Sequence, residues 1–188
     1  PLGIKDFFES QLKAFEKELE GRKKWEVRPN EDGLLYEIYE VEKGYIYEDK
    51  AAQISPFEVD HKPVEPAYGY KIQFNKAGKT KKIVISGDTR KSKTLIEESF
   101  KADALIHEVF VGLGFDKNRM SKETIENVAN YHTSPKEVGE VAKEAKVKKL
   151  ILTHFVPPSF DEEKLKNEVR DVYKGDIVIG QDLLNIEV

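Results

Sequence analysis

The sequence predicts an α/β fold, and two observations predict it. From Lys81 onward, short apolar runs typical of strands alternate with segments of helical periodicity, which is the pattern of α/β layering. Before that point, short runs rich in Tyr, Ile, Val and Phe predict antiparallel strands. No linker is long enough to divide the chain, so we expect residues 1–188 to belong to a single domain.

The composition narrows the class of protein. The 188 residues are 39% hydrophobic and 35% charged, which suits a globular domain with a real core. The absence of cysteine excludes disulfides, thiolate metal sites and a cysteine nucleophile, and fits a cytoplasmic location. The formal net charge is -4 and lysines are scattered among glutamates, so no basic stripe is visible, although a local patch can hide inside an acidic average. No segment reads as a membrane span or a signal peptide.

The chain is expected to begin with a helix. Phe8, Leu12, Phe15 and Leu19 form one apolar stripe at helical spacing, which predicts a core-facing helix. Gly21 is a plausible stop for it.

Strands and further helices follow in order. The predicted strands lie at 34–41, 44–48, 53–61, 68–74, 81–88, 103–110, 149–155 and 176–188. The predicted helices lie at 93–101, 121–131 and 160–175, the last with Leu165, Val169 and Val172 facing inward.

The clearest helix is the one that follows His132. Ser134 can cap it, Pro135 fits its first position and Glu137 completes a capping box. Its predicted buried stripe consists of Val138, Val141, Ala142 and Ala145.

Residues able to hold a metal gather at the ends of these elements. The four histidines are His61, His107, His132 and His154, and each lies near an element boundary or late in a strand. Ligands of open α/β sheets bind beyond the carboxyl ends of strands, so Asp88, Glu108 and His154 would meet at one edge. Without thiolates, imidazole and carboxylate are the ligands that zinc prefers. A histidine at a strand end is more often structural, and Gly-Asp after a strand is usually a turn. The pattern alone leaves a metal or acid–base site and ordinary boundary residues equally open.

Several motifs together resemble a known family. They are "VDHKPVEPAYGYKI", "ISGDTR", "ALIHEVF", "YHTSPKEVGEVAKEAKVKKLILTHF" and "GDIVIGQDLL", which span about Phe57 to the C-terminus. The sequence resembles the C-terminal part of metallo-β-lactamase-fold hydrolases, in the branch of ribonuclease Z and its phosphodiesterase and arylsulfatase-like relatives. The resemblance implies an αββα sandwich, of which this chain would hold one sheet, its flanking helices and part of the other sheet.

The resemblance also implies roles for individual residues. His61 would bind a first metal, Asp88 would bridge two metals and His154 would bind the second. His132 would face the scissile group without binding metal, with Glu108 orienting it and His107 lying beside the site. Two divalent metal ions are implied, zinc first and manganese or iron as alternatives, and the attack would come from a metal-bound hydroxide.

Two departures from the family matter. The strand-end H-x-H-x-D-H motif is absent, since the nearest histidine pair, His132 and His154, is 22 positions apart. "PLGIKDFF" looks like the turn and helix that follow this motif, so the chain reads as a domain cut just after its first ligand cluster, with weak or vacant metal binding expected in this chain alone. The long RNA-gripping arm is replaced by "QFNKAGKTKKIVI", which argues against tRNA 3′ processing.

We therefore expect a metal-dependent hydrolase acting on phosphodiesters, RNA among them. Sulfate esters, other esters and lactones are alternative substrates. A non-catalytic α/β fragment or partner-binding half is the alternative of another class. Because a partial domain leaves one sheet face uncovered, we expect a homo-oligomer or pairing with an N-terminal half, and no membrane partner.

Overall fold

Two helices, α1 (Ile4–Ala14) and α2 (Glu16–Trp25), begin the chain. They belong to the first of two compact units, residues Pro1–Glu42 and Lys43–Val188, each of which is described by itself. The computed structural model describes residues 3–26, 36–42, 44–112, 115 and 120–188.

The first unit differs from its predicted form. The helix is interrupted at Phe15, and α2 continues through Gly21 to Trp25, so the predicted stop at Gly21 is wrong. A glycine inside a helix costs only about 1 kcal/mol, which the flanking turns can absorb. No residue of α1 or α2 is buried, so the predicted core-facing stripe is not observed, although the Phe8 ring contacts Tyr36 at 5.3 Å. Of the strand predicted at 34–41, residues 34 and 35 lie outside the described residues and 36–41 form no strand.

The second unit is built on one seven-stranded sheet in the order β1-β2-β3-β4-β5-β6-β7. The strands are β1 (Tyr47–Glu48), β2 (Ala52–Val59), β3 (Ala67–Lys76), β4 (Lys79–Ile85), β5 (Ala104–Phe110), β6 (Lys149–Val156) and β7 (Asp176–Ile179). Pairs from β1 to β4 are antiparallel and pairs from β4 to β7 are parallel. The predicted α/β class is confirmed, with the antiparallel part first. The described residues form this one sheet, and the part of a second sheet that the resemblance implied is not among them.

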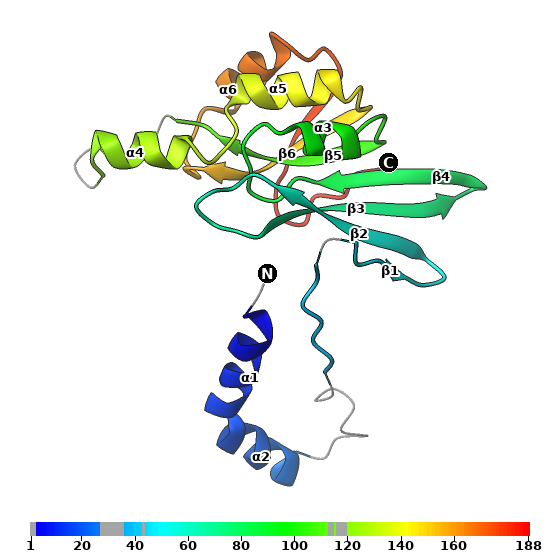
Figure 1. The fold of residues 1–188 in the computed structure, drawn as a ribbon, viewed down its shortest axis with the longest axis vertical. Helices are drawn as coiled ribbons and strands as arrows, with labels where there is room; N and C mark the ends of the chain where they lie inside the picture. The colour runs from blue at the N-terminus through cyan, green and yellow to red at the C-terminus, as the bar shows by residue number, and fades with distance from the viewer. Residues whose placement is uncertain (1–2, 27–35, 43, 113–114, 116–119) are drawn as a thin grey trace. The chain divides into compact units, whose positions relative to one another are not determined.

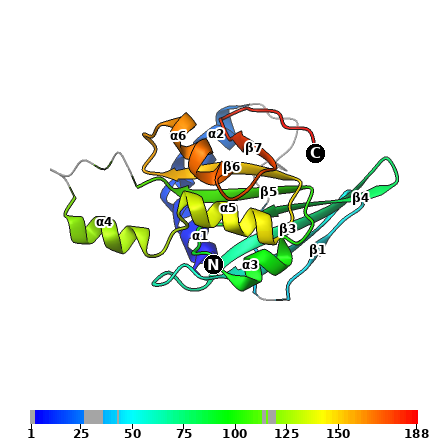
Figure 2. The same cartoon turned by 90° about the horizontal axis from the view of Figure 1, so that it is seen from above.

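The helices cover one face of this sheet. They are α3 (Lys93–Glu98), α4 (Lys122–Ala129), α5 (Pro135–Glu144) and α6 (Glu162–Arg170). Crossovers between parallel neighbours are right-handed, so connections that step in one direction along the sheet place their helices on the same side. Figures 1 and 2 show α3, α5 and α6 on that side, with α4 projecting beyond one edge of the sheet. The capping box predicted for α5 is present, with Ser134 accepting from the Glu137 N–H.

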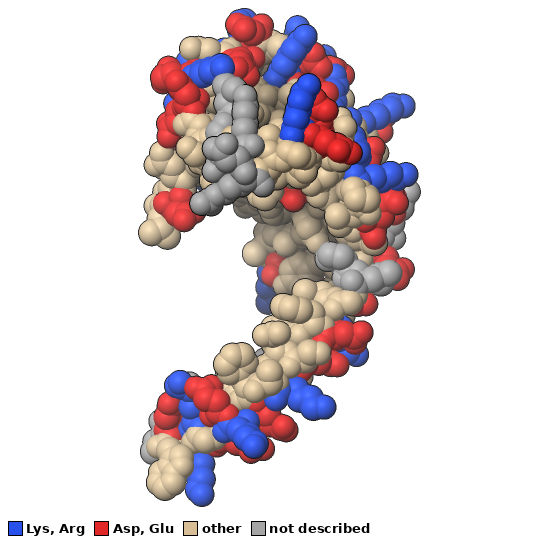
Figure 3. All heavy atoms as spheres, turned by 90° about the vertical axis from the view of Figure 1, so that its left-hand side faces the viewer, with Lys and Arg blue, Asp and Glu red and all other residues tan. Residues whose placement is uncertain are grey.

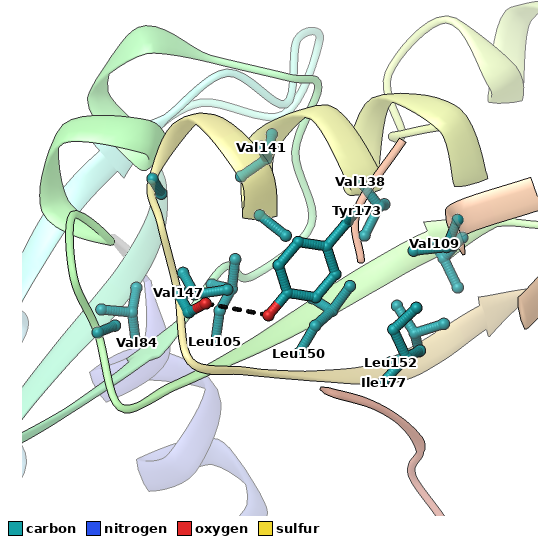
Figure 4. Packing of buried hydrophobic residues seen from close by; sticks show 14 of the residues in the cluster. Val84, Leu105, Val109, Val138, Val141, Val147, Leu150, Leu152, Tyr173 and Ile177 are labelled. Atoms are coloured by element: carbon teal, nitrogen blue, oxygen red, sulfur yellow. Dashed lines mark hydrogen bonds between the residues drawn. The ribbon is translucent and has the colours of Figure 1, made fainter. Parts of the chain in front are cut away.

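The core lies between the sheet and these helices. Val84, Leu105, Leu150 and Ile177 share one register row and are buried beneath the helical layer. Tyr173 packs among them and donates a hydrogen bond of 3.0 Å to the Val147 carbonyl, as Figure 4 shows. Leu165 and Val169 of α6 are buried as predicted, and Tyr173 after the helix is buried too, while the predicted inward residue Val172 is only half-buried.

The opposite face of the sheet also carries apolar side chains. One register row places Tyr70, Ile85, Ile106, Ile151 and Val178 on that face, because paired strand residues point the same way. All of these except Ile151 remain partly exposed. Among the described residues, no helix has the length and apolarity needed to cross a membrane.

Candidate active site

Four strands end at the same edge of the sheet. β2 runs parallel to β4, because each is antiparallel to β3, and β5 and β6 run parallel to β4. Their carboxyl ends therefore deliver His61, Asp88, Glu108 and His154 to one edge. His132 joins them from the turn that precedes α5.

The Asp88 carboxylate lies between two histidines. Its Oδ2 atom is 3.4 Å from His154 Nε2 and 3.9 Å from His61 Nε2. Metal–nitrogen and metal–oxygen bonds of about 2 Å place two ligands of one cation roughly 3.3 Å apart. The His154–Asp88 pair matches that spacing, and the His61–Asp88 pair is somewhat wider. The spacing of His154 Nε2 and Asp88 Oδ2 thus suits two ligands of one divalent cation.

His61 is held with its other ring nitrogen occupied. Its Nδ1 lies 2.8 Å from the Tyr131 carbonyl oxygen, which can only accept, so Nδ1 carries the proton. Nε2 is then unprotonated in the neutral ring and directs its lone pair toward Asp88. Metal-binding histidines in proteins usually have this second hydrogen bond.

His154 sits in a β-bulge. β5 and β6 pair in register up to Glu108 and Thr153, and the next pair joins Val109 to Phe155, so His154 is the extra residue. Its φ of 43° lies in the left-handed region, which a non-glycine residue occupies at a cost of roughly 1–2 kcal/mol. Bulges beside active sites re-aim side chains, and this one directs an exposed histidine toward Asp88.

Glu108 joins the loops of the site. Its side chain is 1% exposed, and Oε1 accepts hydrogen bonds from the backbone N–H groups of Thr89 at 3.3 Å and Thr133 at 3.0 Å. Thr133 also donates its hydroxyl to the Thr89 carbonyl at 2.5 Å. The loop that carries Asp88 and the loop that carries His132 are therefore fixed to the same buried carboxylate.

His132 also faces this carboxylate. Its Nδ1 is 3.2 Å from Glu108 Oε1, yet the two groups are out of line for a hydrogen bond, and Nδ1 has no hydrogen-bond partner in the described structure. The imidazole is enclosed by other rings, with centroid distances of 5.0 Å to Tyr131, 5.2 Å to His61 and 5.8 Å to His154.

His107 points away from this edge. Successive strand residues face opposite sides of a sheet, so next to Glu108 it faces the helical layer and is fully buried. Its Nδ1 donates to the Glu108 carbonyl oxygen at 2.6 Å. Burial lowers the pKa of His107, against the smaller opposing effect of Glu108, so the ring is neutral near pH 7. His107 is therefore a core residue, whereas the resemblance implied that it lies beside the site.

Arg90 and Gly87, which the sequence reasoning did not single out, position His61 and Asp88. The Arg90 guanidinium binds the Asp60 carboxylate at 2.7 Å, and the Arg90 N–H donates to the Asp60 carbonyl at 2.8 Å, so the residues next to His61 and near Asp88 are joined. Gly87 has a φ of 62°, and a Cβ there would lie 2.4 Å from the Tyr68 carbonyl oxygen. Arg90 and Gly87 lie inside the motif "ISGDTR", and this position is the only sign in the sequence of their roles.

The described residues do not form a complete metal site by themselves. Within residues 3–26, 36–42, 44–112, 115 and 120–188, no three His, Asp or Glu side chains form a group that could hold a metal ion. Beside His154, a cavity of about 500 Å³ opens between Ile106 and Ile151, on the sheet face opposite the helices, and the C-terminal residues Leu184 and Ile186.

Two curated proteins with related sequences carry the same name. No family model matches the chain. The whole chain aligns at 28% identity, over 193 residues, with ribonuclease Z of Mycobacterium marinum, and at 28% identity, over 194 residues, with ribonuclease Z of Mycobacterium bovis. It spans 66% and 65% of the lengths of these two proteins.

A solved structure shares the fold. The metallo-β-lactamase-fold protein YhfI from Bacillus subtilis superposes with a TM-score of 0.56 at 23% identity, covering 75% of this chain and 52% of that one. A diphosphatase of the PhnP family superposes with a TM-score of 0.50 at 18% identity, covering 76% and 46%.

Proposed function

We propose that this chain, which is ribonuclease Z-like along its whole length and has the metallo-β-lactamase fold, forms part of a metal-dependent hydrolase that cleaves phosphodiester bonds. The observation that carries the proposal is the placement of Asp88 Oδ2 between His61 Nε2 and His154 Nε2, with the His132–Glu108 pair alongside. His132, Asp88 and the imidazoles of His61 and His154 lie at one sheet edge, where they would serve as acid, carboxylate ligand and nitrogen ligands in the hydrolysis of an anionic ester.

His61, Asp88 and His154 would hold divalent cations, zinc by the nature of the donors, with manganese and iron as alternatives. Two such cations, when bound, stabilise the charge of a phosphodiester in its transition state and make an attacking water more acidic. The residues of this chain would orient both reactants. Since three ligands are few, further ligands would come from outside the described residues.

His132 would act as the proton donor. With Nδ1 facing Glu108, its Nε2 is the atom that can hand a proton to the departing alkoxide. Breaking the P–O bond leaves the electron pair on that oxygen, and the proton from Nε2 neutralises it. Glu108 would act through His132, by holding its ring orientation and tautomer, and would not touch the substrate.

The substrate class follows in part from a short turn. β3 and β4 are joined by Ala77 and Gly78 alone, both at positive φ, which is the tight two-residue turn of a β-hairpin. No arm extends from this turn to grip a folded RNA. We therefore propose phosphodiesters in general as substrates, single-stranded RNA among them. We also propose a cytoplasmic location for the protein. A second copy or an N-terminal segment would cover the open sheet face.

Hydrolysis by the full-length protein tests the proposal. An aryl phosphodiester should be cleaved with about two metal ions bound per chain, whereas an aryl sulfate, a carboxylic ester and a lactone should react more slowly. Asp88→Asn should lose both metal and activity, while Asp171→Asn, at an exposed helix end far from the ligands, should keep both. Metal-free, inactive wild-type protein would favour the non-catalytic alternative, and a faster reaction with the sulfate or the lactone would replace the substrate class.

A further inference from the structure

A second surface lies at the opposite edge of the sheet, where the parallel strands begin. Five lysines gather there around the ring of Phe100 and the carboxylate of Asp103: Lys81, Lys82, Lys101, Lys146 and Lys148. They come from the start of β4, the ends of α3 and α5, and the approach to β6. We call this set the basic patch. On the face shown in Figure 3, by contrast, both signs of charge are interspersed.

The fold brings these lysines together through backbone contacts. The Lys101 N–H donates to the Ala145 carbonyl at 2.7 Å, so α3 and α5 end side by side. The Asp103 N–H donates to the Lys82 carbonyl at 2.8 Å, and the Lys148 N–H donates to the Ala102 carbonyl at 3.0 Å. The positions of the lysine backbones are therefore fixed, although their sequence positions are widely separated.

Most of the positive charge in the basic patch is unbalanced. Among the described residues, Asp103 is the one carboxylate that forms ion pairs with these lysines, and it accepts from Lys81 at 3.3 Å and Lys148 at 2.8 Å. In the described residues, Lys101 and Lys146 have no carboxylate partner. Their ammonium groups lie over the Phe100 ring, 5.3 Å and 5.8 Å from its centroid. Burial, and then repulsion from Lys71 outside the basic patch, lowers the pKa of Lys82, against the smaller opposing effects of Glu98 and Asp103.

Phe100 gives the basic patch an aromatic surface. Its side chain is 44% exposed, although it is one of the larger apolar residues of this unit. Positively charged grooves interleaved with exposed aromatic rings are the usual surfaces for single-stranded nucleic acid, since phosphates meet the cations and a base stacks on the ring. Lysines after helix ends also complement the helix dipoles, but that role requires no exposed aromatic ring.

We infer that the basic patch binds the phosphate backbone of a single-stranded RNA, with a base against Phe100, at a distance from the bond that is cleaved. This inference rests on the proposed function, since it concerns the same substrate. β5 joins the two edges with seven residues, which corresponds to roughly 20 Å. An RNA of several nucleotides is needed to reach from one edge to the other, so the basic patch would favour RNA over dinucleotides and small diesters.

RNA binding without catalysis tests this. A labelled, unstructured RNA of about 12 nucleotides is titrated with the protein in the presence of a chelator. The fluorescence anisotropy of the RNA gives its affinity over a range of salt concentrations. Lys101→Gln/Lys146→Gln should bind roughly tenfold more weakly at low salt, and the slope of log affinity against log salt should fall by roughly 0.7 per lysine. Lys101→Arg/Lys146→Arg should bind as the wild type does.

The matched control removes the same charge elsewhere. Lys93 and Lys164 are exposed and lie outside the basic patch, so Lys93→Gln/Lys164→Gln should leave affinity and slope nearly unchanged. Equal effects of the two double variants would overturn the inference, because general charge would then explain the binding. If Lys101→Gln/Lys146→Gln lost binding to phosphatidylserine vesicles while its RNA binding stayed intact, the inference would also be overturned. The basic patch would then be a lipid-binding surface.

A third variant tests the base contact. Phe100→Leu should weaken RNA binding about fivefold or more, since stacking contributes about 1–3 kcal/mol per base, without changing the salt slope. Wild-type affinity in this variant would remove the base from the inference. Because no step requires metal or turnover, failure here is distinct from failure of hydrolysis, which is measured on a small diester that does not reach the basic patch.

Discussion

The Nδ1 atom of His132 lies 3.2 Å from Oε1 of Glu108, and both side chains are buried at the carboxyl edge of the sheet. Glu108 accepts two backbone hydrogen bonds through the same oxygen, so its position is fixed by the loops and not by the histidine. His132 can therefore be replaced without disturbing Glu108, which makes the pair suitable for separating chemistry from structure.

Replacement of His132 should impair the reaction and leave metal binding intact. In the full-length protein, His132→Ala should lower turnover roughly 10²–10⁴-fold on a diester with a poor alkoxide leaving group, because one positioned proton donor is lost. With a nitrophenolate leaving group the loss should shrink. Elemental analysis should find wild-type metal content in His132→Ala and reduced metal content in His154→Ala. An equal loss on both substrates would mean that His132 binds or orients the substrate, and loss of metal would make it a ligand.

The stability of Glu108 variants should depend on whether the new side chain can still accept hydrogen bonds from the two backbone N–H groups. Glu108→Ala leaves the buried N–H groups of Thr89 and Thr133 without an acceptor, at about 1–3 kcal/mol each. Glu108→Gln retains a carbonyl oxygen there and should lose clearly less. Urea unfolding followed by circular dichroism gives both values, and similar losses in the two variants would mean that the charge, and not the acceptor, stabilises the loops.

Gly87 should be irreplaceable for a steric reason. Gly87→Ala combines a φ of 62° with a Cβ 2.4 Å from the Tyr68 carbonyl oxygen, and it adjoins Asp88. Gly78→Ala has a comparable φ of 74° and meets nothing within 4 Å, so it isolates the backbone cost of about 1 kcal/mol. Thermal unfolding should show the larger loss for Gly87→Ala, and metal affinity should fall only in that variant. Equal effects would show that the contact with Tyr68 is relieved by a backbone shift.

Asp103 should make stability depend on pH in the acid range. Burial raises the pKa of Asp103, but hydrogen bonds from Lys148, the Lys82 N–H and Lys81 outweigh it and lower the pKa from 3.8 to about 2. A carboxyl with a depressed folded-state pKa stabilises the fold above its unfolded pKa, and this contribution is lost as the pH falls from about 4 toward 2. The shift corresponds to at most about 2 kcal/mol, less in practice because Lys148 is 70% exposed.

The comparison with Asp103→Asn measures that contribution. By urea unfolding, the variant should be about 1–2 kcal/mol less stable than wild type at neutral pH, and the gap should narrow near pH 3. Asp171→Asn, which removes an exposed carboxylate, should show no such narrowing. If the difference in unfolding free energy between Asp103→Asn and wild type stayed constant with pH, the pKa of Asp103 would not be lowered in the folded protein.

The sequence predicted the parts of the site that depend on element ends. The α5 capping box and the strands that end near Asp88, Glu108 and His154 follow from local patterns, and parallel pairing brings those ends together. The interruption at Phe15 was not predictable in this way, because the apolar stripe runs through it without a break. The bulge at His154 has no local signature either, since it is defined only by its pairing with β5.

Residues whose roles depend on long-range contacts could not be assigned from the sequence. Which of His107 and Glu108 faces the helical layer follows from which face of β5 the helices cover, and the strand does not decide it because both of its faces are mostly buried. The basic patch was hidden for the same reason: Lys82, Lys101 and Lys146 are far apart in an acidic chain, and only the ends of α3 and α5 bring them together.

The shared acceptor at Glu108 has a consequence for motion. Two loops that depend on one buried oxygen cannot open independently, since release of either N–H exposes the carboxylate that holds the other. The amide protons of Thr89 and Thr133 should therefore exchange with solvent deuterium at linked rates, in one cooperative opening. The loop that carries Asp88 and the loop that carries His132 would then form a single dynamic unit, which is either assembled or absent as a whole.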